Sequence, residues 1–300
     1  GYGDRAGRCG ASIGSWPLGA SGRPVCAPSA TLGPVNRMWQ PAGIDPTANP
    51  PAGRVAPDMV WDAWGVPEGH APLSERIRGL LTQVFGISGE PAAHRDEGDV
   101  PLRSSELSAD HRAGLSTVVG VDRVSTEHRD RLRHAGGKST LDLLRRRAEG
   151  PQDAPDAVVF PADHDQVAAV LTYCADHEIA VVPFGGGTSV VGGLDPVRGR
   201  FTAVISLDLR GLNELLAVDP VSRTATFGAG VTGPRAEGLL AEHGLSLGHF
   251  PQSFEFASIG GFAATRSSGQ ASFGYGRFDD MVQRLRIATP TGTVNVGRAP

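Results

Sequence analysis

The spacing of apolar positions divides this chain into a helical stretch and a later stretch in which strands and helices alternate. Between residues 74 and 150 apolar residues recur at helical spacing, first in 74–85, and Ser108 and Thr126 are placed to cap the next two helices. From residue 155 onward, short β-branched runs alternate with helical segments. This pattern predicts strands at 157–160, 179–183, 203–208, 215–218 and 224–229, and a hairpin that pairs 283–289 with 293–296.

Two helices are predicted among these strands. Asp163 is placed to cap the first, whose apolar positions Val167, Val170, Leu171 and Cys174 follow helical spacing and predict a core face for Cys174. Thr232 is placed to cap the second. The order predicts an α+β fold, with a small βαβ-containing lobe followed by a mainly antiparallel lobe.

A glycine-rich motif follows the predicted strand at 179–183. Pro183 and Phe184 lead into Gly185, Gly186 and Gly187, and Thr188 and Ser189 follow them. Glycine has no Cβ and tolerates positive φ, so successive amides can approach an anion, and the two hydroxyls add donors. The motif matches neither a Walker loop nor GxGxxG. A purely structural glycine turn would contain the same residues, so the motif by itself leaves both interpretations open.

A second segment, 248–269, is dense in small and hydroxyl-bearing residues. Ser258 is placed to cap a short helix through Ala264, and Gly260 and Gly261 would let a backbone or a flat ligand approach that helix. Arg266 follows among further hydroxyls. Such a composition is poorly suited to an ordinary core.

The two segments together resemble the PCMH-type FAD-binding domain of the vanillyl-alcohol oxidase superfamily, in its alkylglycerone-phosphate synthase branch with its bacterial relatives. The likeness is carried by 183–190, 251–258 and 265–269, which match family motifs. Gln252 stands where the family usually has Asp, and a Ser-Glu-Gly-Thr-Leu-Gly segment of the family does not occur in these 300 residues. The resemblance implies two α/β lobes with FAD between them.

The resemblance also implies the cofactor contacts. The turn would bind the pyrophosphate, and the other two segments would contact the flavin and its ribityl or phosphate atoms. The expected residues are Pro183, Phe184, Gly185, Gly186, Gly187, Thr188, Ser189, Gln252, Ser253, Phe254, Glu255, Phe256, Ala257, Ser258, Thr265, Arg266, Ser267 and Ser268.

Several of these residues have an alternative role. Local capping would equally explain Ser253, Ser258 and Thr265, and Arg266 could pair with Asp279 or Asp280 instead of a phosphate. If the turn is a cradle, a side chain at Gly186 is expected to obstruct the ligand before it disturbs the fold.

The expected FAD is non-covalent. No histidine stands among residues 178–184, His177 comes too early in the motif, and a structural role is favoured for His249. In the family, catalytic groups lie largely in a cap domain that follows the FAD domain, so no catalytic residue is assigned. The alternatives are a 2-hydroxy-acid oxidoreductase of the glycolate or D-lactate type and a non-catalytic remnant with an incomplete nucleotide site.

The predicted organisation has three parts. Residues 1–58 are rich in glycine and proline and are expected to be a disordered leader or the product of a mis-assigned start before Met59. Residues 59–150 form a helical segment and 151–300 the FAD-binding domain. The chain is interpreted as an N-terminal fragment that lacks the cap domain, through which a homodimer would form.

Composition limits the partners. A net charge of −4 and a pI near 6.1 argue against nucleic acid, and no apolar stretch reaches membrane-spanning length. Three cysteines without metal spacing predict neither a disulfide framework nor a metal site, which favours a cytoplasmic protein. The family resemblance implies a small-molecule substrate. The basic run Arg145–Arg147 is predicted to be a solvated face.

Overall fold

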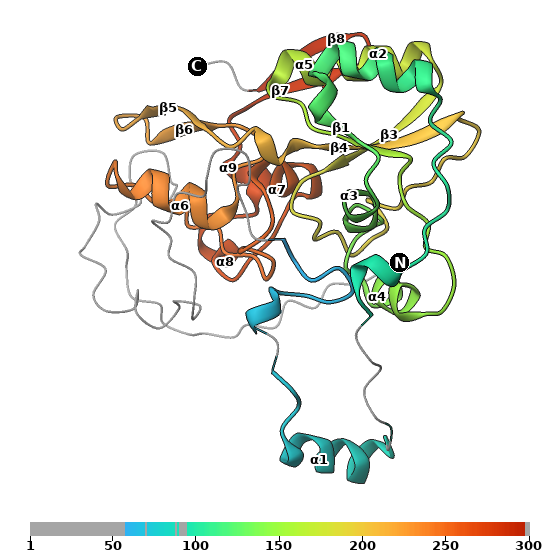
Figure 1. The fold of residues 1–300 in the computed structure, drawn as a ribbon. Helices are drawn as coiled ribbons and strands as arrows, with labels where there is room; N and C mark the ends of the chain where they lie inside the picture. Colours follow the sequence, from blue (N-terminus) through green and yellow to red (C-terminus); the bar gives the residue numbers. More distant parts are fainter. Residues whose placement is uncertain (1–57, 70, 88, 90–94, 298–300) are drawn as a thin grey trace, which may run out of the picture. The chain divides into compact units, whose positions relative to one another are not determined.

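The structure is a computed structural model that describes residues 58–69, 71–87, 89 and 95–297. The described residues all belong to one compact unit. Its helices and strands are, in chain order, α1 (Glu75–Phe85), α2 (Ala109–Val119), β1 (Val124–Ser125), α3 (His128–Arg133), α4 (Thr140–Arg147), β2 (Ala157–Val159), α5 (His164–Asp176), β3 (Ile179–Phe184), β4 (Ala203–Asp208), β5 (Leu215–Asp219), β6 (Thr224–Phe227), α6 (Gly233–Ala241), α7 (Ile259–Thr265), α8 (Ser272–Tyr275), α9 (Phe278–Met281), β7 (Arg284–Thr289) and β8 (Gly292–Gly297) (Figure 1).

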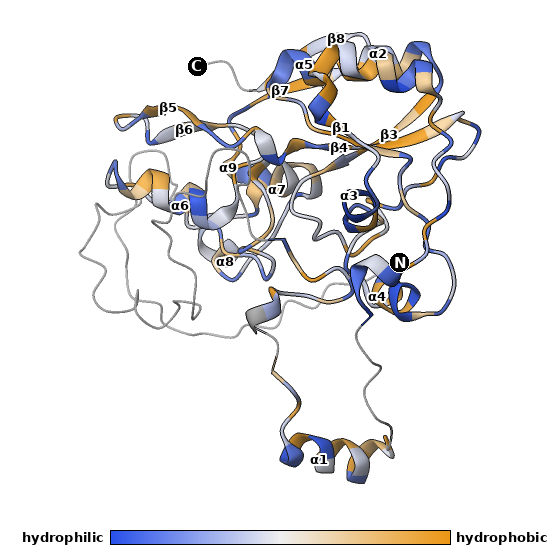
Figure 2. Ribbon diagram, viewed as in Figure 1, coloured by the Kyte–Doolittle hydropathy of each residue, from blue (hydrophilic) through white to orange (hydrophobic). Residues whose placement is uncertain are grey.

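A four-stranded sheet in the order β1-β2-β4-β3 forms the centre of the first lobe. Strands β2, β4 and β3 are parallel, whereas β1 is antiparallel to β2. Every residue of β2 and β4 is buried, which accounts for the mainly apolar sequence of both strands, although β4 also buries Ser206 and Asp208. Figure 2 shows the hydrophobic colour along β3 and β4. The last residues of β3 and β4, Phe184 and Asp208, are aligned across the ladder. This shared edge is where the glycine-rich turn begins.

Helices α2 and α5 pack beside this sheet and share its core (Figure 1). The side chain of Asp163 accepts a hydrogen bond from Gln166 N at 2.8 Å, which confirms the predicted cap of α5. Cys174 is 1% exposed, and burial raises the pKa of its thiol to about 12. The prediction that Cys174 belongs to the core is confirmed.

The second lobe holds the antiparallel hairpin β5-β6 together with α6 to α9, whereas the antiparallel hairpin β7-β8 returns to the first lobe and packs on α5 (Figure 1). Both hairpins were predicted from the sequence, so the mixed α+β fold is confirmed. Thr232 precedes α6 as predicted, but its side chain makes no cap hydrogen bond. Pro234 lies in the first turn of α6, and its ring fixes φ near the helical value, which favours the start of the helix in the absence of that bond.

The helical region before residue 150 differs from the prediction in two places. Ser108 caps α2 as expected. Helix α3 begins at His128, so its N-cap is Glu127 and not the predicted Thr126, and the Glu127 side chain makes no cap hydrogen bond. The run 145–147 is not a uniformly solvated face, because Arg146 is only 4% exposed. Its guanidinium donates to the carbonyls of Gly136 and Trp61, which replace water as its hydrogen-bond partners.

Helix α1 has the predicted apolar face, but the structure buries no residue of this helix. The proposed leader, with Cys9 and Cys26, lies outside the described residues apart from Asp58. Across the described segments, no helix combines the length and the apolar character that crossing a membrane requires.

The core position of Ile205 yields a stability prediction. Ile205 is fully buried in β4, so Ile205→Ala should lower the free energy of unfolding by about 2–5 kcal/mol through lost burial and the cavity left behind. Val221 is 91% exposed, and Val221→Ala should change stability by less than about 0.5 kcal/mol. Denaturant unfolding of both variants checks this difference, and equal effects would contradict the assigned core.

Candidate functional site

The glycine-rich turn leaves the sheet at the end of β3, beside the end of β4. Within the described part of the chain, the backbone amides of residues 185–189 donate no hydrogen bond. Gly187 is nevertheless buried, and buried amides are almost always paired in folded proteins. A row of unpaired amides at a glycine turn is the arrangement that binds an anionic oxygen.

The turn packs directly on the segment 251–258. A Cβ on Gly185 would lie 2.5 Å from Ser258 Oγ, and one on Gly186 would lie 1.9 Å from the carbonyl oxygen of Phe256. Gly187 has a φ of +70°, a conformation that favours glycine. The structure therefore brings the first two predicted cofactor segments into contact. The expectation that a side chain at Gly186 would obstruct a ligand before disturbing the fold is wrong, because the backbone of 256–257 fills that space.

A third segment, which connects α3 to α4, also contacts the turn. The amide of Lys138 donates to Ser189 O at 2.7 Å, and a Cβ on Gly137 would lie 2.1 Å from the same oxygen. Gly137 is thus required by the approach of the turn. The Gly136-Gly137 pair was visible in the sequence, but its partner was not.

Residues 252–258 have mixed environments. Phe254, Phe256, Ala257 and Ser258 are buried, Ser253 and Glu255 are half-buried, and Gln252 is exposed. Ser258 Oγ accepts a hydrogen bond from Gly261 N at 3.3 Å, so the predicted cap of α7 is confirmed. Because Ser258 also touches the turn, capping and a cofactor contact are compatible.

Residues 265–268 lie at the far end of α7, about 10 Å from Ser258 along the helix. Thr265 donates to Gly261 O, and Arg266 pairs with Asp279 at 2.9 Å with its side chain 62% exposed. Ser267 Oγ lies 3.0 Å from Nε2 of the buried His249, while Ser268 is exposed. In this structure, Arg266 therefore has the acidic partner named as the alternative to a phosphate.

A pocket lies beside the turn and is completed by residues far from it in sequence. Its lining consists of Asp58, Met59, Trp61, Arg133, His134, Gly136, Lys138, Phe184, Gly186, Gly187, Arg210 and Phe256. Only four of these twelve residues, Phe184, Gly186, Gly187 and Phe256, were among the predicted cofactor contacts. The others belong to 58–61, to α3 and the residues after it, and to the end of β4.

Residues 58–64 are fixed against this pocket by several polar contacts. The Asp58 carboxylate pairs with Arg133 and, at 3.0 Å, with Arg210. The Lys138 ammonium group donates to the carbonyls of Val60 and Trp61, at 3.0 Å for Trp61, and Trp64 Nε1 donates to Lys138 O at 3.1 Å. This segment was not assigned to the site from the sequence.

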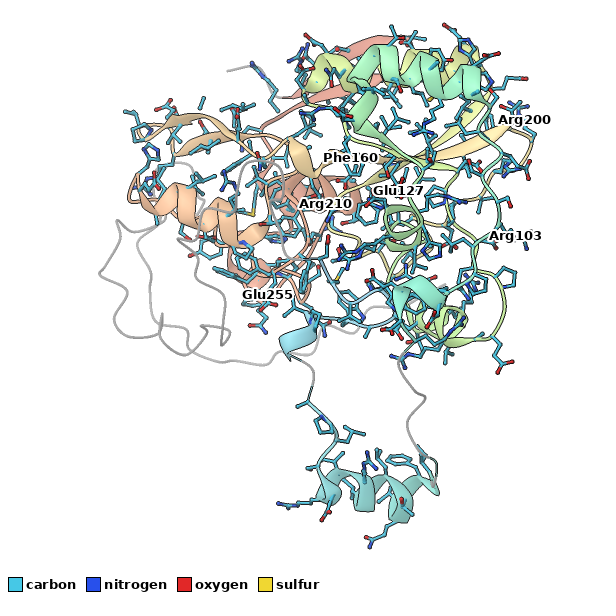
Figure 3. The ribbon with its side chains drawn as sticks, in the orientation of Figure 1. Arg103, Glu127, Phe160, Arg200, Arg210 and Glu255 are labelled. Atoms are coloured by element: carbon cyan, nitrogen blue, oxygen red, sulfur yellow. The ribbon has the colours of Figure 1, made fainter. Side chains whose placement is uncertain are left out.

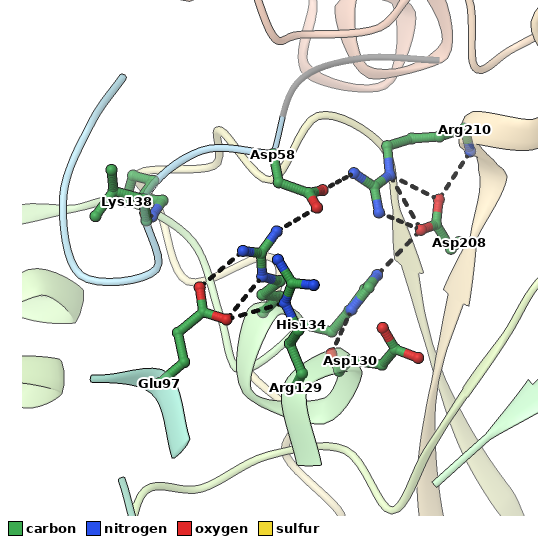
Figure 4. Close-up of polar contacts among 10 residues, drawn as sticks. Asp58, Glu97, Arg129, Asp130, His134, Lys138, Asp208 and Arg210 are labelled. Atoms are coloured by element: carbon green, nitrogen blue, oxygen red, sulfur yellow. Dashed lines mark hydrogen bonds and ion pairs between the residues drawn. The ribbon is translucent and has the colours of Figure 1, made fainter. Parts of the chain in front are cut away.

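A buried charge cluster underlies the pocket (Figure 4). Asp208 is 2% exposed and accepts hydrogen bonds from His134 Nε2 at 3.1 Å and from Arg210 Nη2 at 2.6 Å. Burial alone would raise the pKa of Asp208, but the bond from His134 and the charge and bonds of Arg210 outweigh it and hold that pKa well below its usual range. Asp208 is therefore ionised throughout the physiological pH range. Figure 3 shows Arg210 and Phe160 among the side chains of this lobe.

Lys138 is the only lysine of the sequence and is 5% exposed. Burial, with a further contribution from the positive charge of Arg146, lowers the pKa of Lys138 to about 7. Both forms of the amine can donate to the two carbonyls it contacts. The charge of this group therefore changes near neutral pH.

The comparisons with known proteins agree with this geometry. Residues 155–297 match a sequence family described as "FAD binding domain". The chain is 40% identical over 176 residues to an alkyldihydroxyacetonephosphate synthase of Dictyostelium discoideum, covering 58% of this chain and 28% of that protein. It is 30% identical over 259 residues to the protein of the same name from Trypanosoma brucei brucei, covering 79% of this chain and 42% of the relative.

A solved structure shows the same fold. The structure of an alkyldihydroxyacetonephosphate synthase superposes with a TM-score of 0.71 and 30% identity, over 80% of this chain and 49% of the other. The chain thus spans less than half the length of these relatives. The match extends beyond residues 155–297, because 80% of the chain cannot fit within that range.

The packing of Gly186 yields a prediction. Gly186→Ala should destabilise the apo-protein by about 1–3 kcal/mol, because its Cβ would collide with the Phe256 backbone. Gly79 in α1 has open space around its Cβ position, so Gly79→Ala should leave the melting temperature unchanged or raise it slightly. Thermal unfolding without FAD checks both, and an unchanged melting temperature for Gly186→Ala would contradict the described contact.

The environment of Lys138 yields a pH prediction. Its pKa of about 7 in the fold is below that of an unfolded lysine, so above pH 7 the unfolded chain binds more protons than the folded one. Wild-type stability should therefore rise with pH, relative to Lys138→Met, by at most about 1.4 kcal/mol per pH unit above pH 7. Denaturant unfolding of both proteins between pH 6 and 9 measures this, and parallel pH profiles would exclude it.

Proposed function

The chain belongs to the FAD-linked oxidase superfamily, whose PCMH-type domain binds FAD, and we propose that the amides of residues 185–189 hold the pyrophosphate of a non-covalent FAD. The observation that carries this proposal is the row of unpaired amides at the end of β3. Amides without an internal partner can bind an anion without first breaking a hydrogen bond. The hydroxyls of Thr188 and Ser189 are placed to add donors beside them.

The neighbouring segments extend the proposed site. Residues 252–258 pack on the turn through Ser258 and the Phe256 backbone, so they are placed to contact the nucleotide beyond its pyrophosphate. Residues 265–268 are assigned the more distant parts of FAD by resemblance. For Arg266 this role requires that a phosphate compete with Asp279, so its contribution should be small.

The two histidines near the proposed site support non-covalent binding. Nδ1 of His134 lies 2.7 Å from Asp130 O and Nε2 lies 3.1 Å from Asp208, so neither nitrogen is available to attack a flavin. His249 is 2% exposed and is bonded to Ser267. The segment 178–184 contains no histidine.

The proposed activity is that of an alkylglycerone-phosphate synthase-like enzyme acting on a small molecule. Two similar proteins bear that name, and the Thr-Arg-Ser-Ser-Gly segment at 265–269 favours the same branch. Bound FAD supplies an electron-accepting ring. The residues of this chain bind and orient the nucleotide, and their unpaired amides hold its negative charge. The alternative in the same family is oxidation of a 2-hydroxy acid.

Flavin titration tests the proposal. The purified chain should bind FAD saturably and turn yellow, and acid or heat denaturation should release all the colour because no bond joins flavin to protein. Thr188→Val should weaken binding by about three- to tenfold, the value of one hydrogen bond. The control is Thr117→Val, whose hydroxyl bonds only within α2 and should have no effect on binding.

Three results would count against parts of this proposal. A chain that stays colourless with FAD would support the non-catalytic alternative. Colour retained on the denatured polypeptide would contradict non-covalent binding. Anaerobic bleaching of the bound flavin by glycolate or D-lactate would favour 2-hydroxy-acid oxidation.

A further inference from the structure

A single buried carboxylate is bonded to two side chains, those of His134 and Arg210, at the edge of the sheet beside the glycine-rich turn. Asp208 ends β4, next to Phe184 at the end of β3. It accepts from His134 on one side and from Arg210 on the other, at 2.6 Å for Arg210 Nη2. Asp208 and His134 are each nearly inaccessible to solvent, so neither can exchange its partner for water without local opening.

The His134 ring is fixed in one orientation. Its Nδ1 faces the carbonyl oxygen of Asp130 and its Nε2 faces Asp208, and both partners are acceptors. Both ring nitrogens are thereby held by protein atoms, so the ring cannot turn without losing one of these two contacts.

The His134 ring reaches the turn through Phe184. The two ring centroids lie 4.1 Å apart with an interplanar angle of 49°. The guanidinium of Arg210 lies 5.4 Å from the centre of the same phenyl ring. Phe184 thus contacts two side chains that share one carboxylate, and cation–π attraction favours the position of the Arg210 guanidinium.

Phe184 in turn supports the glycines. A Cβ on Gly187 would lie only 2.9 Å from Phe184 Cζ, so the backbone of the turn rests on the phenyl ring. A shift of that ring would move Gly187 and the amides that precede it. The contacts run without a gap from Asp208 through His134 and Phe184 to Gly187.

We propose that His134, held by Asp208, is a positioning residue for the cofactor: it fixes Phe184 and through it the direction of the amides of residues 185–187. This inference rests on the proposed binding of FAD pyrophosphate by the turn. The proposed effect of His134 is transmitted through its contact with Phe184. Its contribution should be seen in FAD affinity beyond any effect on the stability of the fold.

The test compares two histidines at the ends of α3 in the full chain, His128 at its first position and His134 directly after it. His134→Asn keeps a donor toward Asp130 O but loses the bond to Asp208 and the ring on Phe184. It should weaken FAD binding by about tenfold or more. The His128 ring is hydrogen-bonded to Val100 O and has no contact with Phe184 among the described residues. His128→Asn should therefore bind FAD as the wild type does, even if its apo melting temperature falls. Flavin titration and apo-protein melting are measured on each.

A double-mutant cycle shows whether His134 acts through Phe184. In a Phe184→Leu background, His134→Asn should change FAD affinity by less than about twofold, because the contact that transmits the effect is already gone. A similar cycle on the apo melting temperature reports the structural part separately. If His134→Asn does not fold, His134→Gln, which retains a donor toward Asp208, replaces it with the same expectation.

The outcomes separate the two claims. Wild-type protein that binds no FAD overturns the proposed function and this inference with it. Wild-type protein that binds FAD, with His134 variants that match its affinity, overturns only the positioning role. An undiminished His134 effect in the Phe184→Leu background shows that the residue does not act through the phenyl ring, which also overturns it.

Discussion

The site depends on how closely three backbone segments approach one another around the turn 185–189. Gly185 and Gly186 contact the segment 256–258 at distances that leave no room for a Cβ, and Gly137 meets Ser189 in the same way. Only glycine permits such approaches. Among the described residues, the amides of this turn donate no hydrogen bond even though the neighbouring segments approach it closely. The residues that pack the turn therefore also leave its donors open for the proposed ligand.

A buried charge below the turn is the second requirement. Isolating Asp208 from water would be strongly unfavourable without partners, and His134 and Arg210 provide them. Arg210 also forms an ion pair with Asp58. Arg133 pairs with the same Asp58 and, at 2.8 Å, with Glu97. The charges are thereby balanced across α3, the end of β4 and the segment that begins at Asp58. Removing Arg210 would take from the buried Asp208 its closest partner, so the cluster favours a single arrangement of these elements.

Residues outside the matched FAD-binding range therefore belong to the site. Asp58, Met59 and Trp61 line the pocket together with Lys138, although the family match begins at residue 155. Trp61 also packs with Val100 and Leu132 in a small core of its own. This gives residues 58–64 a structural role in the folded chain.

Local patterns in the sequence determined β4, the cap of α5 by Asp163, the cap of α7 by Ser258 and the core position of Cys174, because each depends on residues a few positions apart. The two cofactor motifs were likewise readable, since each is continuous. The Ser139–Asp142 capping box of α4 was also local and was overlooked. The burial of Arg146 and the His134–Asp208 pair were not readable, because their partners lie 85 and 74 residues away. A charged residue in a helical pattern is solvated by default, and only the tertiary structure supplies the carbonyls and carboxylates that let it be buried.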